Sequence, residues 1–319
     1  MGKLIIAAII DPVHTLVPFH DTTLQLLETA SRMGHRTLVC ETGGLSLQGP
    51  ELKLCLTEVV IRQGTRTRPE TSFWKVRGKP VTVRSSEVDV ILMRKDPPVD
   101  QQYFQALWML DYSRAPVINE PEGIRAASEK LFALNFADWM PPTLVTARRD
   151  DIDAFCREQG GRIVLKPLDG FAGRSVYIWD LKGENHGVIW EEITRRGTRP
   201  VMAQRFLPAV KKGDKRILLW NGIPLGAINR VASRGEARSN LAAGGKAEPA
   251  RITPRERELI DALAPSLLEH GLFFVGLDVI GGYLTEINVT SPTGLVELEA
   301  FSGVSHSGKI LAELADILG

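Results

Sequence analysis

The distribution of apolar and polar residues along the first third of the chain predicts strands that alternate with helices. Three segments show the short apolar runs of strands buried within a sheet: residues 4–10, 35–41 and 88–93. Apolar positions three or four residues apart predict a helix over residues 21–34, which Asp21 or Thr22 can cap and Gly34 can end. This order favours a doubly wound parallel sheet, so residues 1–120 are expected to form an N-terminal α/β domain.

The pattern changes in the rest of the chain. Residues 46–86 are mixed and polar, which predicts irregular connections and short strands. Residues 121–200 contain strand, helix and strand followed by a further strand and helix, an α+β unit small enough to move as a lid. Residues 201–319 hold extended segments, a helix over 253–271, two strands around a Gly-Gly pair and a C-terminal helix, which predicts a second α+β unit.

Composition restricts the partners and the compartment. The chain has 319 residues, more than one compact core usually holds, and a net charge of +1, which favours neither a nucleic acid nor an anionic membrane as partner. The N-terminal apolar run is too short to span a bilayer. Three cysteines, Cys40, Cys55 and Cys156, stand far apart without CxxC spacing, which is typical of the reducing cytoplasm.

The segment RIVLKPLDGFAGRSVYIW, residues 162–179, joins two apolar runs through a loop that contains Gly170 and Gly173. Backbone N–H groups of such a loop can surround phosphate oxygens, and Lys166, at the end of the first run, can add a positive charge. The P-loop pattern GxxxxGK[ST] does not occur. A phosphate site and a plain β-hairpin with a solvated lysine are therefore both open on these residues alone.

A second group of polar residues lies in VGLDVIGGYLTEINVTSPTG. Asp278, Glu286 and Asn288 carry the hard oxygen donors that Mg²⁺ selects. A strict two-residue turn at 281–282 would place Asp278 opposite Thr285, whereas a three-residue loop or a bulge at the glycines would place it opposite Glu286. A shared metal ion therefore predicts an irregularity in this hairpin, and the alternative is an edge hairpin with polar residues on its wet face.

Arginines and a glycine-rich segment complete the candidate chemistry. The planar guanidinium groups of Arg216 and Arg230 suit carboxylates and phosphates, although each could be a surface residue. Segment 231–246 is either a disordered connector or a mobile flap over a cleft. A lid with lysines, a divalent-cation face and arginines together suit ATP-driven activation of a carboxylate, because a flap would shield the acyl phosphate from water until an amine attacks it.

Several motifs in order resemble the bacterial glutathione synthetase family of the ATP-grasp superfamily. The resemblance runs from about residue 5 to residue 310 and is carried by ILMRKDPP, SEKLFA, VLKPLDG, MAQRFLPAVKKGDKRIL, NLAAGGKAEP and VGLDVIGGYLTEINVTSPTG. It implies an ATP-grasp fold, with residues 121–200 as the lid subdomain and 201–319 as the C-terminal subdomain. It also implies an ATP-dependent ligase that joins γ-glutamylcysteine and glycine through an acyl phosphate, giving glutathione, ADP and phosphate.

The resemblance assigns roles to matching positions. It implies that ATP is bound by Lys130, Lys166, Gly170, Gly173, Gln204, Arg205, Phe206 and Leu207. It implies two Mg²⁺ or Mn²⁺ ions held by Asp278, Glu286 and Asn288, and catalytic roles for Arg216, Arg230, Arg238 and Asn240. Residues 291–293 would lie near the bound peptide, segment 231–246 would close over the site, and the protein would be a homo-oligomer, a tetramer or a dimer.

Two departures from the family pattern concern the peptide substrate. After TSPTG the family often continues Ile-Arg-Glu, whereas this chain has Leu295, Val296 and Glu297, and the middle of the stretch DPVHTLVPFHDTT is less typical. Another ATP-grasp carboxylate–amine ligase, with a different dipeptide or amine, is the alternative function. A non-catalytic nucleotide-binding protein is disfavoured, because the lysines and the three metal-type ligands are all present.

Overall fold

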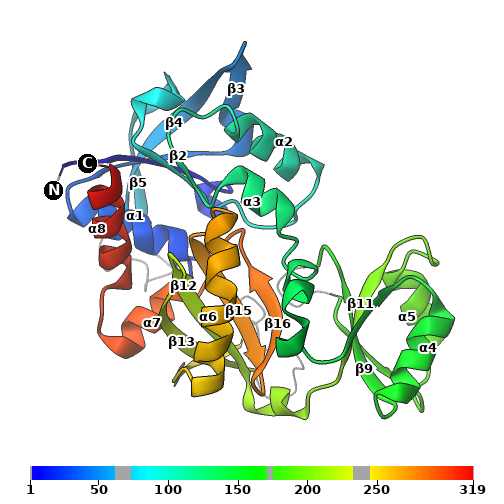
Figure 1. Ribbon diagram of the computed structural model, residues 1–319. Helices are drawn as coiled ribbons and strands as arrows, with labels where there is room; N and C mark the ends of the chain where they lie inside the picture. Colours follow the sequence, from blue (N-terminus) through cyan, green and yellow to red (C-terminus); the bar gives the residue numbers. More distant parts are fainter. Residues whose placement is uncertain (1, 62–72, 171–174, 233–244, 319) are drawn as a thin grey trace.

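Three β-sheets, each with its own helices, make up the chain (Figure 1). The computed structural model describes residues 2–61, 73–170, 175–232 and 245–318. Within these ranges the sheets contain seven, four and five strands. They follow one another along the chain, so the ribbon passes from the first sheet through the lid to the third sheet.

The first sheet is parallel at its centre. Its strands follow the order β3-β4-β2-β1-β6-β7, with β5 beside β4, and those around the centre are β1 (Ile5–Ile9), β2 (Arg36–Cys40), β6 (Val90–Met93) and β7 (Val117–Ile118). The helices of this part of the chain are α1 (Thr22–Arg32), α2 (Gln101–Leu110) and α3 (Pro121–Ala126). Asp21 caps α1 by accepting a hydrogen bond from the backbone N–H of Leu24 at 2.7 Å, as the sequence predicts.

The prediction of irregular connections and short strands over residues 46–86 is partly wrong, because two of the strands in the described part of this region are long. The described part of this region forms β3 (Leu45–Gln48), β4 (Glu51–Ile61) and β5 (Trp74–Arg84), which extend the sheet with antiparallel pairing. In β4 apolar side chains alternate with polar ones, so Leu52, Leu54 and Leu56 are buried on one face. The polar composition of this segment made it look irregular, although buried and exposed positions alternate in β4 as in a strand with one solvent-exposed face.

The four-stranded lid sheet has the order β10-β9-β11-β8. Its elements are β8 (Thr143–Thr146), α4 (Arg149–Glu158), β9 (Arg162–Pro167), β10 (Tyr177–Asp180), α5 (His186–Ile193) and β11 (Val201–Arg205). A separate apolar cluster, which includes the fully buried Trp179 and Ile163, holds this unit together. The lid, green in Figure 1, stands apart from the rest of the ribbon.

The third sheet is antiparallel and has the order β14-β13-β12-β15-β16. Its strands are β12 (Asp214–Trp220), β13 (Ile223–Val231), β14 (Lys246–Ala250), β15 (Phe274–Ile280) and β16 (Tyr283–Asn288), and the helices are α6 (Pro254–Glu269), α7 (Leu295–Ser302) and α8 (His306–Leu318). The C-terminal segment thus forms two helices rather than one. Gly303, at φ +67°, separates them, because a residue in the left-handed region ends α7.

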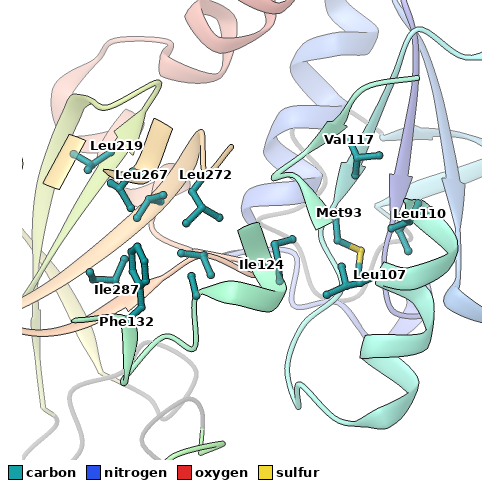
Figure 2. Close-up of a cluster of buried hydrophobic side chains, with 14 of the residues drawn as sticks. Met93, Leu107, Leu110, Val117, Ile124, Phe132, Leu219, Leu267, Leu272 and Ile287 are labelled. Carbon is teal, nitrogen blue, oxygen red and sulfur yellow. The ribbon is translucent and has the colours of Figure 1, made fainter. Parts of the chain in front are cut away.

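One apolar core joins the first and third sheets. Met93 and Leu107 of the first unit belong to the same cluster as Leu219 and Ile287 of the third. Figure 2 shows Ile124 between these two groups and Phe132 beside Ile287. The segment that carries Phe132, a 3-10 stretch over Phe132–Trp139, also contacts β16. This shared core fixes the third sheet against the first. Most buried apolar side chains of the lid form a separate cluster, although Met202 of β11 belongs to the shared core.

Candidate active site

One row of side chains crosses the third sheet at its centre. Arg216 of β12 is the direct cross-strand partner of Asp278 of β15, and Asp278 is the partner of Glu286 of β16. Partners in adjacent strands project from the same face of a sheet, with their Cβ atoms about 5 Å apart. Asn288 lies two residues beyond Glu286 on that face. The row therefore brings together one of the predicted arginines and all three predicted metal ligands.

The pairing of Asp278 with Glu286 depends on a bulge. Gly281 and Gly282 form a two-residue turn, since Ile280 pairs with Tyr283. The register then shifts between Asp278 and Val279, which leaves Thr285 as the extra residue of β16. Its hydroxyl donates to the carbonyl of Asp278 at 3.1 Å. The predicted irregularity is thus confirmed, in the strand rather than at the glycines.

The carboxylate of Asp278 is buried between two guanidinium groups. Arg216 Nε donates to Oδ1 at 2.5 Å and Arg216 Nη2 to Oδ2 at 3.1 Å, while Arg230 Nη2 lies 2.9 Å from Oδ2. Burial alone would raise the pKa of Asp278, but the two arginines overcome it and hold that pKa well below its usual range. The carboxylate is therefore ionised throughout the physiological range.

Asp214 is a site residue that the sequence prediction missed. It is the cross-strand partner of Arg230, whose Nη2 donates to Asp214 Oδ2 at 2.5 Å. Burial, together with the Asp278 carboxylate, raises the pKa of Asp214 to about 6, although Arg230 opposes this. The available signal was its place two residues before Arg216, on the same face of β12. Lys215, between them, faces the other way and contacts Glu256 at 2.7 Å.

Lys130 comes to this row from the segment that leads into the 3-10 stretch. Its Nζ lies 2.8 Å from Oε1 of Glu286 and donates to the carbonyl of Gly170 at 2.5 Å. Burial works against the ammonium charge, but the carboxylates of Glu286, Glu129 and Asp169 outweigh it and raise the pKa of Lys130. Lys130 thus connects Gly170, in the glycine-containing loop after β9, with Glu286 on the candidate metal-binding face of the hairpin.

Lys166 reaches the same region from β9 of the lid. Its Nζ donates to Oε1 of the buried Gln204 at 2.7 Å, and Gln204 in turn donates to Thr143 at 3.1 Å. Burial lowers the pKa of Lys166, against the opposing effect of the Glu286 carboxylate. Lys130 lowers it as well, which places the two candidate phosphate lysines within electrostatic range of each other.

Residues 204–207, which the resemblance assigns to ATP binding, run from the end of β11 into the turn that precedes the third sheet. The guanidinium of Arg205 lies 5.4 Å from the ring centre of Tyr283, and that of Arg162 lies 4.4 Å from the ring centre of Phe206. Leu207 precedes a 3-10 turn over Pro208–Lys212. These contacts hold the side chains of the segment between lid and third sheet. The backbone N–H groups of Arg205 and Phe206 donate to the carbonyls of Pro142 at 3.0 Å and Arg162 at 3.4 Å.

Some predicted residues lie outside the described ranges. These are Gly173, Arg238 and Asn240, together with residues 233–244 of the predicted loop 231–246. The ends of that loop are described: Val231 of β13 pairs with Lys246 of β14. The loop therefore starts and finishes on the strand pair that carries Arg230.

A Mg²⁺ or Mn²⁺ ion is bound by oxygen donors, and the hairpin β15–β16 carries several of them. The described residues contain no group of three His, Cys, Asp or Glu side chains placed to hold a metal ion. The hairpin offers two carboxylates and one amide, Asp278, Glu286 and Asn288, on one face. All three are hard oxygen donors, so the chemistry of the set fits Mg²⁺ or Mn²⁺.

Two arginines donate hydrogen bonds to backbone carbonyls of the segment 291–293. Arg216 Nη1 donates to the carbonyl of Thr293 at 3.2 Å, and Arg94 Nη2 donates to that of Pro292 at 3.0 Å. Arg94 is buried, follows β6 and was not singled out by the sequence prediction. Its position after a buried parallel strand was the available signal, because ligands bind at that edge of such sheets.

The two departures from the family pattern meet in space. His20, in the atypical N-terminal stretch, forms an ion pair with Glu297 of α7, at the position that follows Leu295 and Val296. This hydrogen bond, together with the charge of Glu297, raises the pKa of His20. His20 thus contacts the glutamate that follows Val296, the residue that stands where the family often has an arginine.

The chain has the ATP-grasp fold. A solved structure of D-cycloserine synthetase DcsG superposes with a TM-score of 0.69 at 17% identity, covering 98% of this chain and 100% of that one. A Chryseobacterium gregarium RiPP-associated ATP-grasp ligase gives a TM-score of 0.65 at 15% identity, covering 98% and 97%. At these identities the likeness concerns the fold, and it confirms the predicted ATP-grasp class.

The chain belongs to the prokaryotic glutathione synthetase family. The model of the family's N-terminal domain matches residues 4–125 and that of its ATP-grasp domain residues 129–303. Glutathione synthetase of Synechocystis sp. is 42% identical over 97% of this chain and 98% of its own length, and that of Synechococcus elongatus is 43% identical over 97% of each. The prediction of an ATP-dependent ligase that forms glutathione is thereby confirmed, and the alternative is not favoured.

Proposed function

We propose that the row Arg216–Asp278–Glu286 and the two lysines form the reaction centre in which ATP activates γ-glutamylcysteine. The observation that carries this proposal is the 2.8 Å contact of Lys130 with Glu286, which brings a lysine suited to phosphates onto the face suited to a cation. Lys166 enters the same region from the lid. The phosphate chain of ATP would then lie between lid and third sheet.

The arginines serve the acid. The free carboxylate of the cysteine residue attacks the γ-phosphorus of ATP, ADP leaves, and the acyl phosphate loses phosphate when the amine of glycine attacks its carbonyl carbon. Arg216 and Arg230 are buried and charged, so they can hold that carboxylate and stabilise the negative charge that develops on it. Asp278 and Asp214 keep their guanidinium planes in place.

Asp278, Glu286 and Asn288 would hold one or two Mg²⁺ or Mn²⁺ ions. Such ions neutralise charge on the transferring phosphoryl group. In the structure Glu286 contacts Lys130, and Asp278 contacts both arginines. Binding of a cation and of phosphates therefore requires these residues to exchange partners. Lys130 would leave Glu286 for a phosphate oxygen, which couples nucleotide affinity to the metal.

The test of the reaction is ADP release measured over a panel of dipeptides and amines. We expect release to require both γ-glutamylcysteine and glycine, with little turnover when either is omitted or replaced. Equal turnover with other dipeptides or amines would contradict the proposed specificity. Direct detection of glutathione, in the same reactions, excludes uncoupled ATP hydrolysis as the source of the signal.

Assembly and location stay predictions. A homo-oligomer, tetramer or dimer, and a cytoplasmic location accord with the family. No helix among the described residues is long and apolar enough to cross a membrane. Sedimentation of the purified protein would decide the number of subunits, and a monomer at working concentration would contradict the expectation.

A further inference from the structure

The carboxylate of Glu129 connects the segment that carries Lys130 with the end of β16. Its Oε1 atom accepts hydrogen bonds from the backbone N–H of Val289 at 3.0 Å and of Thr290 at 3.2 Å, and from the Thr290 hydroxyl at 2.8 Å. The backbone carbonyl of Glu129 accepts a fourth bond, from the N–H of Ile287 at 2.9 Å. Glu129 thus accepts hydrogen bonds from three residues in and just after β16: Ile287, Val289 and Thr290.

Candidate site residues lie on both sides of this connection. Lys130 follows Glu129 directly, and its ammonium contacts Glu286, the residue before Ile287. On the other side, Thr290 leads into residues 291–293, which Arg216 and Arg94 hold. A shift of the Glu129 carboxylate would therefore move the lysine relative to the candidate metal face and relative to the segment expected near the peptide.

The number of bonds to one oxygen explains why a side chain with an acceptor oxygen stands here. Two backbone N–H groups and a hydroxyl converge on Oε1, and Thr290 is buried, so these donors would lose their partner without access to water. The amide oxygen of glutamine could accept the same three bonds, whereas alanine could accept none. This difference separates a positioning role from a role that needs the charge.

We propose that Glu129 is a positioning residue that sets Lys130 and residues 291–293 relative to one another, and so links the nucleotide and dipeptide sites. The proposal rests on the proposed function of these two groups. It assigns Glu129 no contact with substrate; its effect passes through Lys130 on one side and Thr290 on the other.

The test compares Glu129→Ala, Glu129→Gln and Thr290→Val in steady-state kinetics and in calorimetric binding of a non-hydrolysable ATP analogue. For Glu129→Ala we expect KM for ATP and KM for the dipeptide to rise together by about tenfold or more, as loss of hydrogen bonds to a charged acceptor implies, with a smaller fall in kcat. Glu129→Gln should stay within about threefold of wild type. Thr290→Val removes one of the three bonds and should raise both KM values by about two- to fourfold.

Asp100→Ala is the matched control. The Asp100 carboxylate also accepts a backbone N–H, that of Tyr103 at 2.9 Å, but it caps α2 and has no contact with the site. We expect this variant to lower the unfolding temperature and leave both KM values unchanged. If Glu129→Ala behaves in the same way, or if Glu129→Gln loses as much as Glu129→Ala, the proposal is wrong.

Two further outcomes distinguish a failure of the Glu129 proposal from a failure of the proposed function. If Glu129→Ala does not fold, Thr290→Val still decides, because unchanged KM values in that variant would overturn the proposal. If the wild type binds the nucleotide analogue but forms no glutathione, the proposed function fails. The calorimetric affinities would then still test Glu129, and equal nucleotide affinity in all three variants and wild type would contradict its role.

Discussion

Lys166 has a neutral partner, and this sets its electrostatic behaviour. Its ammonium bonds the amide oxygen of Gln204 rather than a carboxylate, and burial lowers its pKa. A charge that is poorly compensated in the free protein gains most when phosphate oxygens arrive. The environment of Lys166 is therefore consistent with a residue kept ready for an anion.

The pH dependence of nucleotide binding tests this interpretation. Because the pKa of Lys166 is lowered in the free protein and bound phosphates would raise it again, binding must take up a proton above the free-state pKa. We expect ATP affinity to fall with rising pH below the ordinary lysine value of about 10.4. Lys166→Ala should weaken binding by about tenfold or more and flatten this dependence. A wild-type affinity that is constant over the alkaline range would contradict the account.

Asp214 shows how one strand separates catalytic from structural charges. Asp214 and Arg216 project from one face of β12, and Lys215 projects from the other, toward Glu256. For Asp214→Ala we expect kcat/KM for the dipeptide to fall by about tenfold or more, because Arg230 loses one of its two buried carboxylates. Kinetic assays would measure the loss of activity, and unfolding curves on the same preparations would measure any loss of stability.

Lys215→Ala provides the comparison on the opposite face. It breaks a partly buried ion pair with Glu256 and should lower stability by about 1–3 kcal/mol while kcat/KM stays near the wild-type value. If both variants lose stability and neither loses activity, Asp214 only stabilises the fold. The residue-type pattern alone could not separate these roles, because the burial of each side chain depends on strand register.

At the scale of elements, the sequence predicted the hairpin β15–β16 but left two registers open for it. The sequence showed donors two residues apart and a glycine turn, and strand geometry reduced the possibilities to two registers. It could not place the bulge, because the extra residue, Thr285, is stabilised by its own contact with the carbonyl of Asp278. The length of strands β4 and β5 was missed for a related reason: exposed side chains make a strand look polar.

The lid can be tested as an element because most of its buried apolar side chains, apart from Met202, form a separate cluster. Ile163 is fully buried in the lid cluster, and Ile163→Ala should destabilise the lid by about 2–4 kcal/mol. We expect faster amide exchange over residues 143–205 and a raised KM for ATP, with the third sheet still protected. Leu219→Ala, in the core that the third sheet shares with the first, should instead increase amide exchange in the first and the third sheet. Equal loss of protection everywhere in Ile163→Ala would show that the lid is not independent.

At the scale of the whole molecule, the shared core sets the geometry that the sequence could not provide. The order of motifs identified the ATP-grasp class, and family membership confirmed it. How Arg94 and Glu129 reach the segment after β16 depends on packing between units far apart in the chain. Contacts of this kind leave no local pattern, so both residues were found only in the structure.

The central claim is that lysines from one side and a cation-binding hairpin from the other grip the phosphates of ATP. A crystal structure with a non-hydrolysable ATP analogue and Mg²⁺ tests it most directly. The account predicts phosphate oxygens within hydrogen-bonding distance of Lys130 and Lys166, and a cation coordinated by Asp278, Glu286 or Asn288. A bound nucleotide with Lys166 turned into solvent and no cation beside Glu286 would contradict it.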